Sequence, residues 1–80
     1  MRIKLFVKQD CPRCPEAKYA CEGLDVEVYD LANVEGLAEA AFHSVMSTPT
    51  VLVVDSGGSE IAAWRGEPPL RDTLRATVAQ

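Results

Sequence analysis

Two cysteines separated by two residues lie where a strand-like segment meets a helix-like segment. Cys11 and Cys14 follow the apolar run Ile-Lys-Leu-Phe-Val at residues 3–7 and precede helix-forming residues at 16–21. At this spacing, on the first turn of a helix, two cysteine sulfurs can form a disulfide without a large backbone movement. The pattern is typical of a redox-active dithiol, and it requires a strand that delivers the chain directly to a helix N-terminus.

The start of a helix favours the thiolate form of a cysteine. Backbone N–H groups of the first turn have no partner inside the helix, and the helix dipole adds partial positive charge there. Pro12 suits the first helical position and Arg13 adds a permanent cation, so both are expected to lower the pKa of the Cys11 thiol. Asp10 acts in the opposite direction. We therefore expect Cys11 to be the exposed nucleophile and Cys14 the resolving thiol.

Pro15 limits where this first helix can begin. A proline inside a helix lacks the backbone N–H and crowds the preceding turn. The regular helix is therefore expected to start near Cys14, with Pro15 as its first residue, and Gly23 is expected to end it in a left-handed conformation. The apolar stripe of this helix is expected to comprise Ala17, Ala20, Cys21 and Leu24.

Cys21 is the third cysteine, and no fourth is present to pair with it. It follows Cys14 by two helical turns and therefore lies on nearly the same face of the helix. Because free cysteine is among the most buried residue types, a buried, inert Cys21 is favoured over a redox-active one.

Strand and helix signals alternate along the next part of the chain. Residues 2–8 and 25–31 predict two strands that flank the first helix, and such a βαβ unit implies a parallel pair with a right-handed crossover. Asn33 is expected to cap a second helix, which residues 46–48 break. The apolar face of that second helix is expected to comprise Val34, Leu37, Ala38, Ala41 and Val45.

The last part of the chain predicts a hairpin and a closing helix. The β-branched run at residues 51–54 suits a central strand that is covered on both faces. A turn at residues 55–59 should return the chain as an antiparallel strand at residues 60–65, in which Trp64 covers the sheet edge. The core-facing side of the closing helix is expected to comprise Leu70, Leu74 and Val78.

Composition argues against several classes of protein. The 80 residues carry a net charge of −4 and their basic residues form no stripe, which argues against nucleic acid as a partner. No apolar stretch approaches the length of a membrane span, and the N-terminal run is too short for a signal peptide. An odd number of cysteines argues against a disulfide-stapled secreted scaffold. We expect one monomeric domain over residues 1–80, in the reducing cytoplasm, without a membrane partner.

The order of these segments, with Cys-Pro-Arg-Cys after the first strand and Thr-Pro-Thr before the third, resembles the thioredoxin and glutaredoxin family. The resemblance covers essentially the whole chain. It implies an α/β thioredoxin fold of minimal, glutaredoxin-like size, in which three helices flank a four-stranded mixed sheet in the order β-α-β-α-β-β-α. It also implies that the Thr48–Pro49 peptide bond is cis, that Pro49 lies against the dithiol, and that Thr48 offers its backbone to an extended substrate.

The same resemblance implies an activity. The chain would be a thiol–disulfide oxidoreductase that reduces protein disulfides and transports electrons through Cys11 and Cys14, with Pro12 and Arg13 tuning the thiolate. It would need no organic cofactor and no metal. Its partners would be disulfide-containing proteins and an electron donor, either a thioredoxin-reductase-like enzyme or a thiol, that reduces the dithiol again.

Two alternatives stay open on the sequence alone. Glutathione-dependent glutaredoxins carry a Gly-Gly and acid cluster before the last helix, and only Gly66 and Glu67, followed by two prolines, occupy that place here. A structural metal would use the same two cysteines together with Cys21 and His43, and an iron–sulfur cluster would be shared between two chains through Cys11. Cys21 should, however, lie about ten Å along the helix from Cys14. His43 is otherwise expected to be a solvated residue near a helix end.

Overall fold

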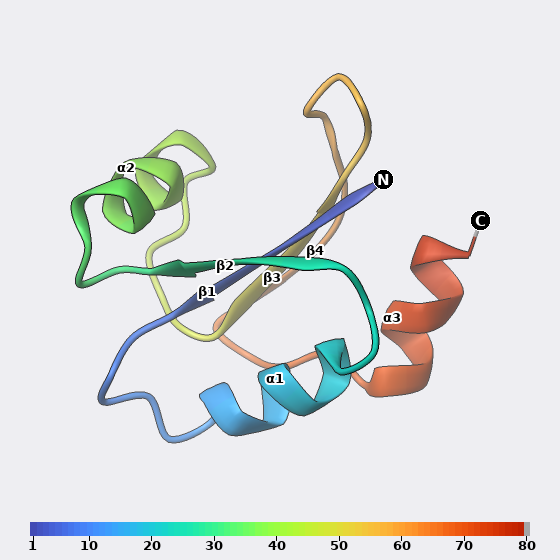
Figure 1. Ribbon diagram of the computed structural model, residues 1–80, viewed down its shortest axis with the longest axis horizontal. Helices are drawn as coiled ribbons and strands as arrows, with labels where there is room; N and C mark the ends of the chain where they lie inside the picture. The colour runs from blue at the N-terminus through green and yellow to red at the C-terminus, as the bar shows by residue number, and fades with distance from the viewer. Residues whose placement is uncertain (80) are drawn as a thin grey trace.

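The computed structural model describes residues 1–79, and a four-stranded mixed sheet lies at its centre (Figure 1). The elements in chain order are β1 (Arg2–Val7), α1 (Cys14–Cys21), β2 (Val26–Asp30), α2 (Val34–Phe42), β3 (Thr50–Val54), β4 (Glu60–Arg65) and α3 (Arg71–Val78). The strands lie side by side in the order β2-β1-β3-β4, and β1 is parallel to β2 while the other two pairs are antiparallel. The predicted fold class and element order are confirmed.

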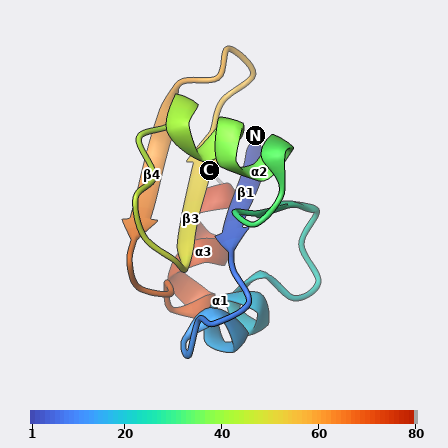
Figure 2. The ribbon, with the colours of Figure 1, turned by 90° about the vertical axis from the view of Figure 1, so that its left-hand side faces the viewer.

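Helices cover both faces of the sheet (Figures 1 and 2). On one face, α1 and α3 pack over Ile3, Leu5 and Val7 of β1, and Leu74 of α3 completes this core. On the other face, α2 lies over the sheet, where Phe6 belongs to a second apolar cluster. β1 therefore buries side chains on both faces of the sheet.

β3 is buried along its whole length between these two helical layers, as its β-branched sequence predicts. The chain then turns around Asp55, whose Oδ1 accepts hydrogen bonds from the backbone N–H groups of Gly57 and Ser59, each at 2.9 Å. β4 forms one edge of the sheet, and half-buried Trp64 packs there against the core under α1 and α3. The prediction that Trp64 covers the sheet edge is confirmed.

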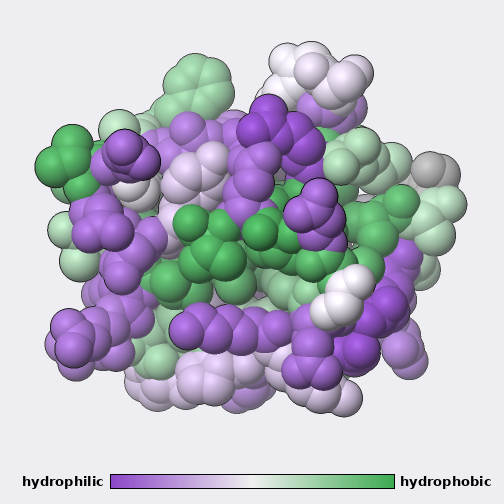
Figure 3. Space-filling model, viewed as in Figure 1, coloured by the Kyte–Doolittle hydropathy of each residue, from purple (hydrophilic) through white to green (hydrophobic). Residues whose placement is uncertain are grey.

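β2 forms the other edge of the sheet. Val28, at the middle of β2, pairs with Leu5 of β1 and yet is 58% exposed. Figure 3 shows apolar side chains gathered over this part of the molecule, between more hydrophilic segments. The helices leave part of this edge uncovered.

α1 begins at Cys14, directly after Arg13, so Pro15 falls in the first turn. A missing N–H costs no helical hydrogen bond at this position, and the start of the helix agrees with the prediction. Gly23 follows the helix with a φ of +82°. The buried residues of α1 are Cys14, Ala17, Ala20 and Cys21.

Within residues 1–79, no helix combines the length and the apolar character that crossing a bilayer requires.

α2 differs from the prediction in its length and in the face that it turns to the sheet. The helix ends at Phe42, before the predicted break, and Ser44 follows with a φ of +57°. Val45 lies beyond the helix and is buried. The four predicted apolar positions inside the helix are all exposed to solvent: Val34, Leu37, Ala38 and Ala41.

Small residues explain the orientation of α2. A Cβ atom on Gly36 would lie 2.6 Å from the carbonyl carbon of Asp30, at the end of β2, so a glycine is required for this close approach. Ala40, about one turn further on, is also buried. Because α2 packs on the sheet through residues with little or no side chain, its larger apolar side chains remain outside.

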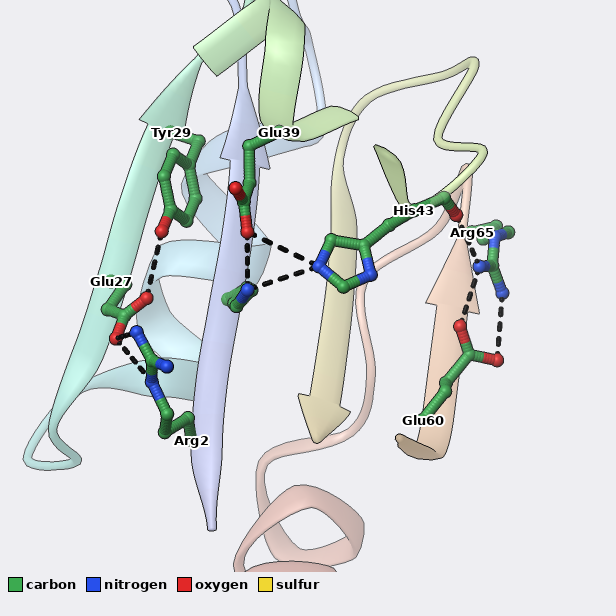
Figure 4. Close-up of polar contacts among 8 residues, drawn as sticks. Arg2, Glu27, Tyr29, Glu39, His43, Glu60 and Arg65 are labelled. Atoms are coloured by element: carbon green, nitrogen blue, oxygen red, sulfur yellow. Dashed lines mark hydrogen bonds and ion pairs between the residues drawn. The ribbon is translucent and has the colours of Figure 1, made fainter. Parts of the chain in front are cut away.

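A buried polar cluster joins α2 to β1 (Figure 4). Lys4 forms a salt bridge with Glu39, and Nε2 of His43 lies 3.1 Å from Nζ of Lys4 and 3.3 Å from Oε2 of Glu39. The side chain of Lys4 is only 9% exposed and that of His43 only 7%. The prediction that His43 is solvated is therefore wrong, because its ring is enclosed between α2 and the sheet, where it also meets the Phe6 ring edge-on.

α3 buries fewer apolar side chains than predicted. Leu74 is completely buried and Val78 is half-buried, but Leu70 is 76% exposed. Leu70 precedes the helix with an extended backbone (φ −71°, ψ 139°), so its side chain does not continue the helical stripe. The assignment of Leu70 to the core is wrong.

Candidate active site

The loop after β1 carries the two cysteines to the N-terminus of α1. β1 is a central strand, and residues 8–13 leave its carboxyl end and reach α1 at Cys14. Cys11 and Cys14 are joined by a disulfide, with their Cα atoms 5.4 Å apart. The structure thus brings together the cysteine pair that the sequence singles out.

The two cysteines differ in accessibility. Cys11 is half-buried, whereas Cys14 is 4% exposed and belongs to the core between the sheet and α1. The backbone N–H of Cys14 donates to the carbonyl oxygen of Cys11 at 3.3 Å, which closes the loop into a turn. An incoming group can therefore reach the sulfur of Cys11 more readily than that of Cys14.

Pro12 and Arg13, between the cysteines, are both exposed. The Arg13 guanidinium is directed along α1, where its Nη2 lies 3.4 Å from Oε2 of Glu16. Both ends of this ion pair are well exposed, so it contributes little to stability. It nevertheless places a carboxylate beside Arg13, the cation that the sequence predicts to stabilise the Cys11 thiolate.

The segment before β3 lies at the same end of the sheet as the cysteine loop. The pairing of β1 with β3 extends to Phe6 and Thr50, so Pro49 follows in register beside the carboxyl end of β1. The Thr48–Pro49 peptide bond is cis, and Pro49 is buried while Thr48 is half-buried. The carbonyl oxygen of Pro49 accepts a hydrogen bond from the backbone N–H of Gly66 at 3.0 Å. The residue that follows β4 therefore helps to hold this segment in place.

A hollow of about 280 Å³ opens beside the disulfide, and we call it the dithiol hollow. Its walls come from the loop after β1, from α1, from the end of β2 and from the loop that follows β2. Two lysines contribute to these walls, and neither stands out from the sequence as a site residue. The spacing of Lys18 from Cys14 is a signal that could have identified it, because residues four apart share a helix face. The sulfur-bearing and charged lining residues are Cys11, Cys14, Lys8, Lys18 and Asp30.

Cys21 is a buried free thiol on α1. Burial raises its pKa to about 11, so it stays protonated at neutral pH. Because the thiolate is the reactive form of cysteine, Cys21 is unreactive in the folded protein. This agrees with the prediction of a buried, inert thiol.

The structure does not assemble the four-ligand metal set considered from the sequence. Cys21 belongs to the core on the α1 face of the sheet, whereas His43 lies against Phe6 on the opposite face. In the part of the chain that the structure describes, no three His, Cys, Asp or Glu side chains are grouped so that they could hold a metal ion.

Models of known protein families give no match to this chain, and neither do curated proteins. Solved structures do match. Thioredoxin 1 from Thermosipho africanus has a TM-score of 0.73 and 24% identity, covering 99% of this chain and 91% of that one. The glutaredoxin-like protein NrdH-redoxin from Escherichia coli, described as having a thioredoxin-like activity profile, has a TM-score of 0.64 and 28% identity, with coverages of 95% and 93%.

A thioredoxin from Thermus thermophilus also matches, with a TM-score of 0.65 and 21% identity over 96% of this chain and 70% of that one. The chain therefore has a thioredoxin fold, and its resemblance to thioredoxin-like and glutaredoxin-like proteins is confirmed. Together with the close cysteine pair, these neighbours support a thiol–disulfide redox function in general.

Proposed function

We propose that this thioredoxin-fold chain is a thiol–disulfide oxidoreductase that reduces protein disulfides. The observation that carries the proposal is the asymmetry of the cysteine pair. Cys11 is accessible and Cys14 is buried directly behind it, within disulfide distance, at the N-terminus of α1. One accessible sulfur beside one protected sulfur suits a reaction in two steps, with a different thiol acting in each.

The proposed reaction exchanges disulfides. The Cys11 thiolate attacks one sulfur of the substrate disulfide, which forms a mixed disulfide and releases the other substrate sulfur as a thiolate. Cys14, once deprotonated, attacks the sulfur of Cys11, and the second substrate sulfur leaves. The substrate gains two electrons and two protons in total, and the protein is left with the Cys11–Cys14 disulfide.

The surroundings of Cys14 bear on its proton. Leu5, on β1, lies in the same core as Cys14 and is 1% exposed. Leucine has no acidic group, so the Cys14 proton has no acceptor at residue 5. In the proposed mechanism it passes to the leaving substrate thiolate or to water.

The segment around the cis peptide is the proposed substrate-binding element. Thr48 is half-buried and lies at the end of the sheet where Cys11 lies. An extended substrate strand could form backbone hydrogen bonds there, which would orient its disulfide toward Cys11 without selecting a particular sequence.

The oxidised dithiol must be reduced again in each cycle. We propose a thioredoxin-reductase-like donor or a thiol pool, in the reducing cytoplasm, as the source of electrons. The NrdH-redoxin neighbour, with its thioredoxin-like activity profile, favours a reductase over glutathione. The sequence Gly-Glu-Pro-Pro at residues 66–69, in place of a Gly-Gly and acid cluster, points the same way.

A protein-disulfide reduction assay driven by dithiothreitol tests the proposal. Wild type is expected to accelerate reduction well beyond dithiothreitol alone, and Cys11→Ser is expected to abolish the acceleration. Cys21→Ser is the matched control, because Cys21 is buried and protonated, and it should retain activity. Wild type that is no faster than dithiothreitol would reject the assignment.

A further inference from the structure

The cation expected to stabilise the thiolate is already paired. Arg13 lies between the two cysteines, but its guanidinium meets Glu16 through two nitrogens, at 3.5 and 3.4 Å. A carboxylate at this distance offsets much of the field that Arg13 would exert on a nearby sulfur. Arg13 is also absent from the walls of the dithiol hollow.

Lys18 is placed differently. It lies on α1, one turn after Cys14, and lines the dithiol hollow together with both cysteines. Among residues 1–79 it has neither a salt bridge nor a side-chain hydrogen bond, so its charge is not offset by a specific partner. Lys18 is itself exposed, so water and salt screen part of its charge, and its effect on a nearby thiolate is expected to be modest.

Other charged groups face the same space. Lys8 contributes a second cation from the loop after β1, and Asp30 a carboxylate from the end of β2. Oδ1 of Asp30 already accepts a hydrogen bond from the backbone N–H of Ala32 at 2.9 Å. Asp10 is exposed next to Cys11 in the chain. The walls thus carry two lysines and one carboxylate that is already hydrogen-bonded, so the hollow favours a negative charge.

We propose that Lys18 is a positioning residue that stabilises the thiolate formed when the Cys11–Cys14 disulfide is reduced, and that it does so more effectively than Arg13. This inference rests on the proposed function, since it concerns the reactive form of the same dithiol. It predicts that the charge of Lys18, and not its length or shape, sets the pH at which the thiolate forms.

Ultraviolet absorbance of the thiolate, followed against pH in the reduced protein, tests this directly. Removing the charge in Lys18→Met is expected to move the midpoint of thiolate formation upward by roughly half a unit, as for a partly screened charge. Lys18→Arg keeps the charge, so its midpoint of thiolate formation should stay near that of wild type. Arg13→Met is the matched control and should shift the midpoint less. Cys21 does not interfere, because its pKa of about 11 lies above the range of interest.

Salt supplies a second measurement. The wild-type midpoint should rise as salt screens Lys18, and the Lys18→Met midpoint should depend less on salt. A Lys18→Met midpoint equal to that of wild type, or a larger shift in Arg13→Met, would overturn the proposal. This outcome is separate from the reduction assay: turnover without a Lys18 effect rejects only this inference, whereas a Lys18 effect without turnover rejects only the proposed function.

Discussion

Gly36 decides how close α2 can come to the sheet. The helix crosses the end of β2 where the backbone of Asp30 occupies the space that a side chain would need. Backbone atoms cannot move aside as the tip of a flexible side chain can. A substitution here must therefore displace the helix, together with the other residues of α2 that pack on the sheet.

Gly36→Ala is expected to destabilise the protein by about 2 kcal/mol. Alanine gains about 1 kcal/mol of helix propensity, but overlap with the Asp30 backbone costs about 3 kcal/mol. Gly57→Ala is the matched control, because a Cβ there would meet only Oδ1 of Asp55 at 3.4 Å, an ordinary contact. Denaturant unfolding measures both variants. Equal stability of the two would show that α2 does not need the close approach.

Glu39 makes the α2 contact sensitive to acid. Lys4 and then His43 hold its pKa below the ordinary value of 4.5, since both favour the charged carboxylate. A carboxyl group whose pKa is lowered by folding stabilises the protein above its unfolded-state pKa. That contribution disappears as the pH falls through the folded-state pKa.

Glu39→Gln should therefore be less stable than wild type at neutral pH, by about 2 kcal/mol, because it leaves the charge of buried Lys4 without a carboxylate. The difference should shrink as the pH falls below 4.5, where the wild-type carboxyl group becomes protonated. Denaturant unfolding of both proteins from neutral pH into acid measures this. A difference that is the same at every pH would contradict the ion pair.

At the scale of elements, α2 shows where sequence periodicity misleads. Its apolar residues recur at helical spacing, which favours burial of that stripe, yet the stripe faces solvent. The inner face is formed instead by Gly36, Ala40, Glu39 and the following His43, of which two are small and two are polar. A pattern of apolar residues cannot reveal this, because the pairing of Glu39 and His43 with Lys4 depends on residues distant in the chain.

The two faces of α2 can be compared by one substitution each. Leu37 is exposed and Ala40 is buried, so Leu37→Lys should change stability by less than about 0.5 kcal/mol, whereas Ala40→Lys should cost about 3 kcal/mol. Thermal unfolding followed by circular dichroism gives both values. If Leu37→Lys were the more damaging change, the predicted apolar face would be the packed one after all.

For the whole molecule, local patterns are sufficient for the order of the elements, whereas the four-stranded mixed sheet was expected from the resemblance to thioredoxin-like proteins. Alternating apolar residues mark β1, a β-branched run marks β3, and the turn cluster between β3 and β4 marks the hairpin. The cysteine pair is found from its spacing alone. The burial of His43 is not, because it depends on which elements lie side by side, whereas the spacing of Lys18 from Cys14 within α1 is a local signal. The assignment of Leu70 to the core fails because Leu70 precedes the first residue of α3, so the apolar stripe of the helix does not include it.

The central claim is that Cys11 attacks a substrate disulfide and Cys14 resolves the product, and trapping the mixed disulfide tests it most directly. Reduced Cys14→Ser, mixed with a disulfide-containing protein, should form a covalent complex that mass spectrometry detects and that dithiothreitol separates by reducing the mixed disulfide. Cys11→Ser should form none, because Cys14 is buried. A complex that forms through Cys14 in Cys11→Ser, or none in either variant, would contradict the account.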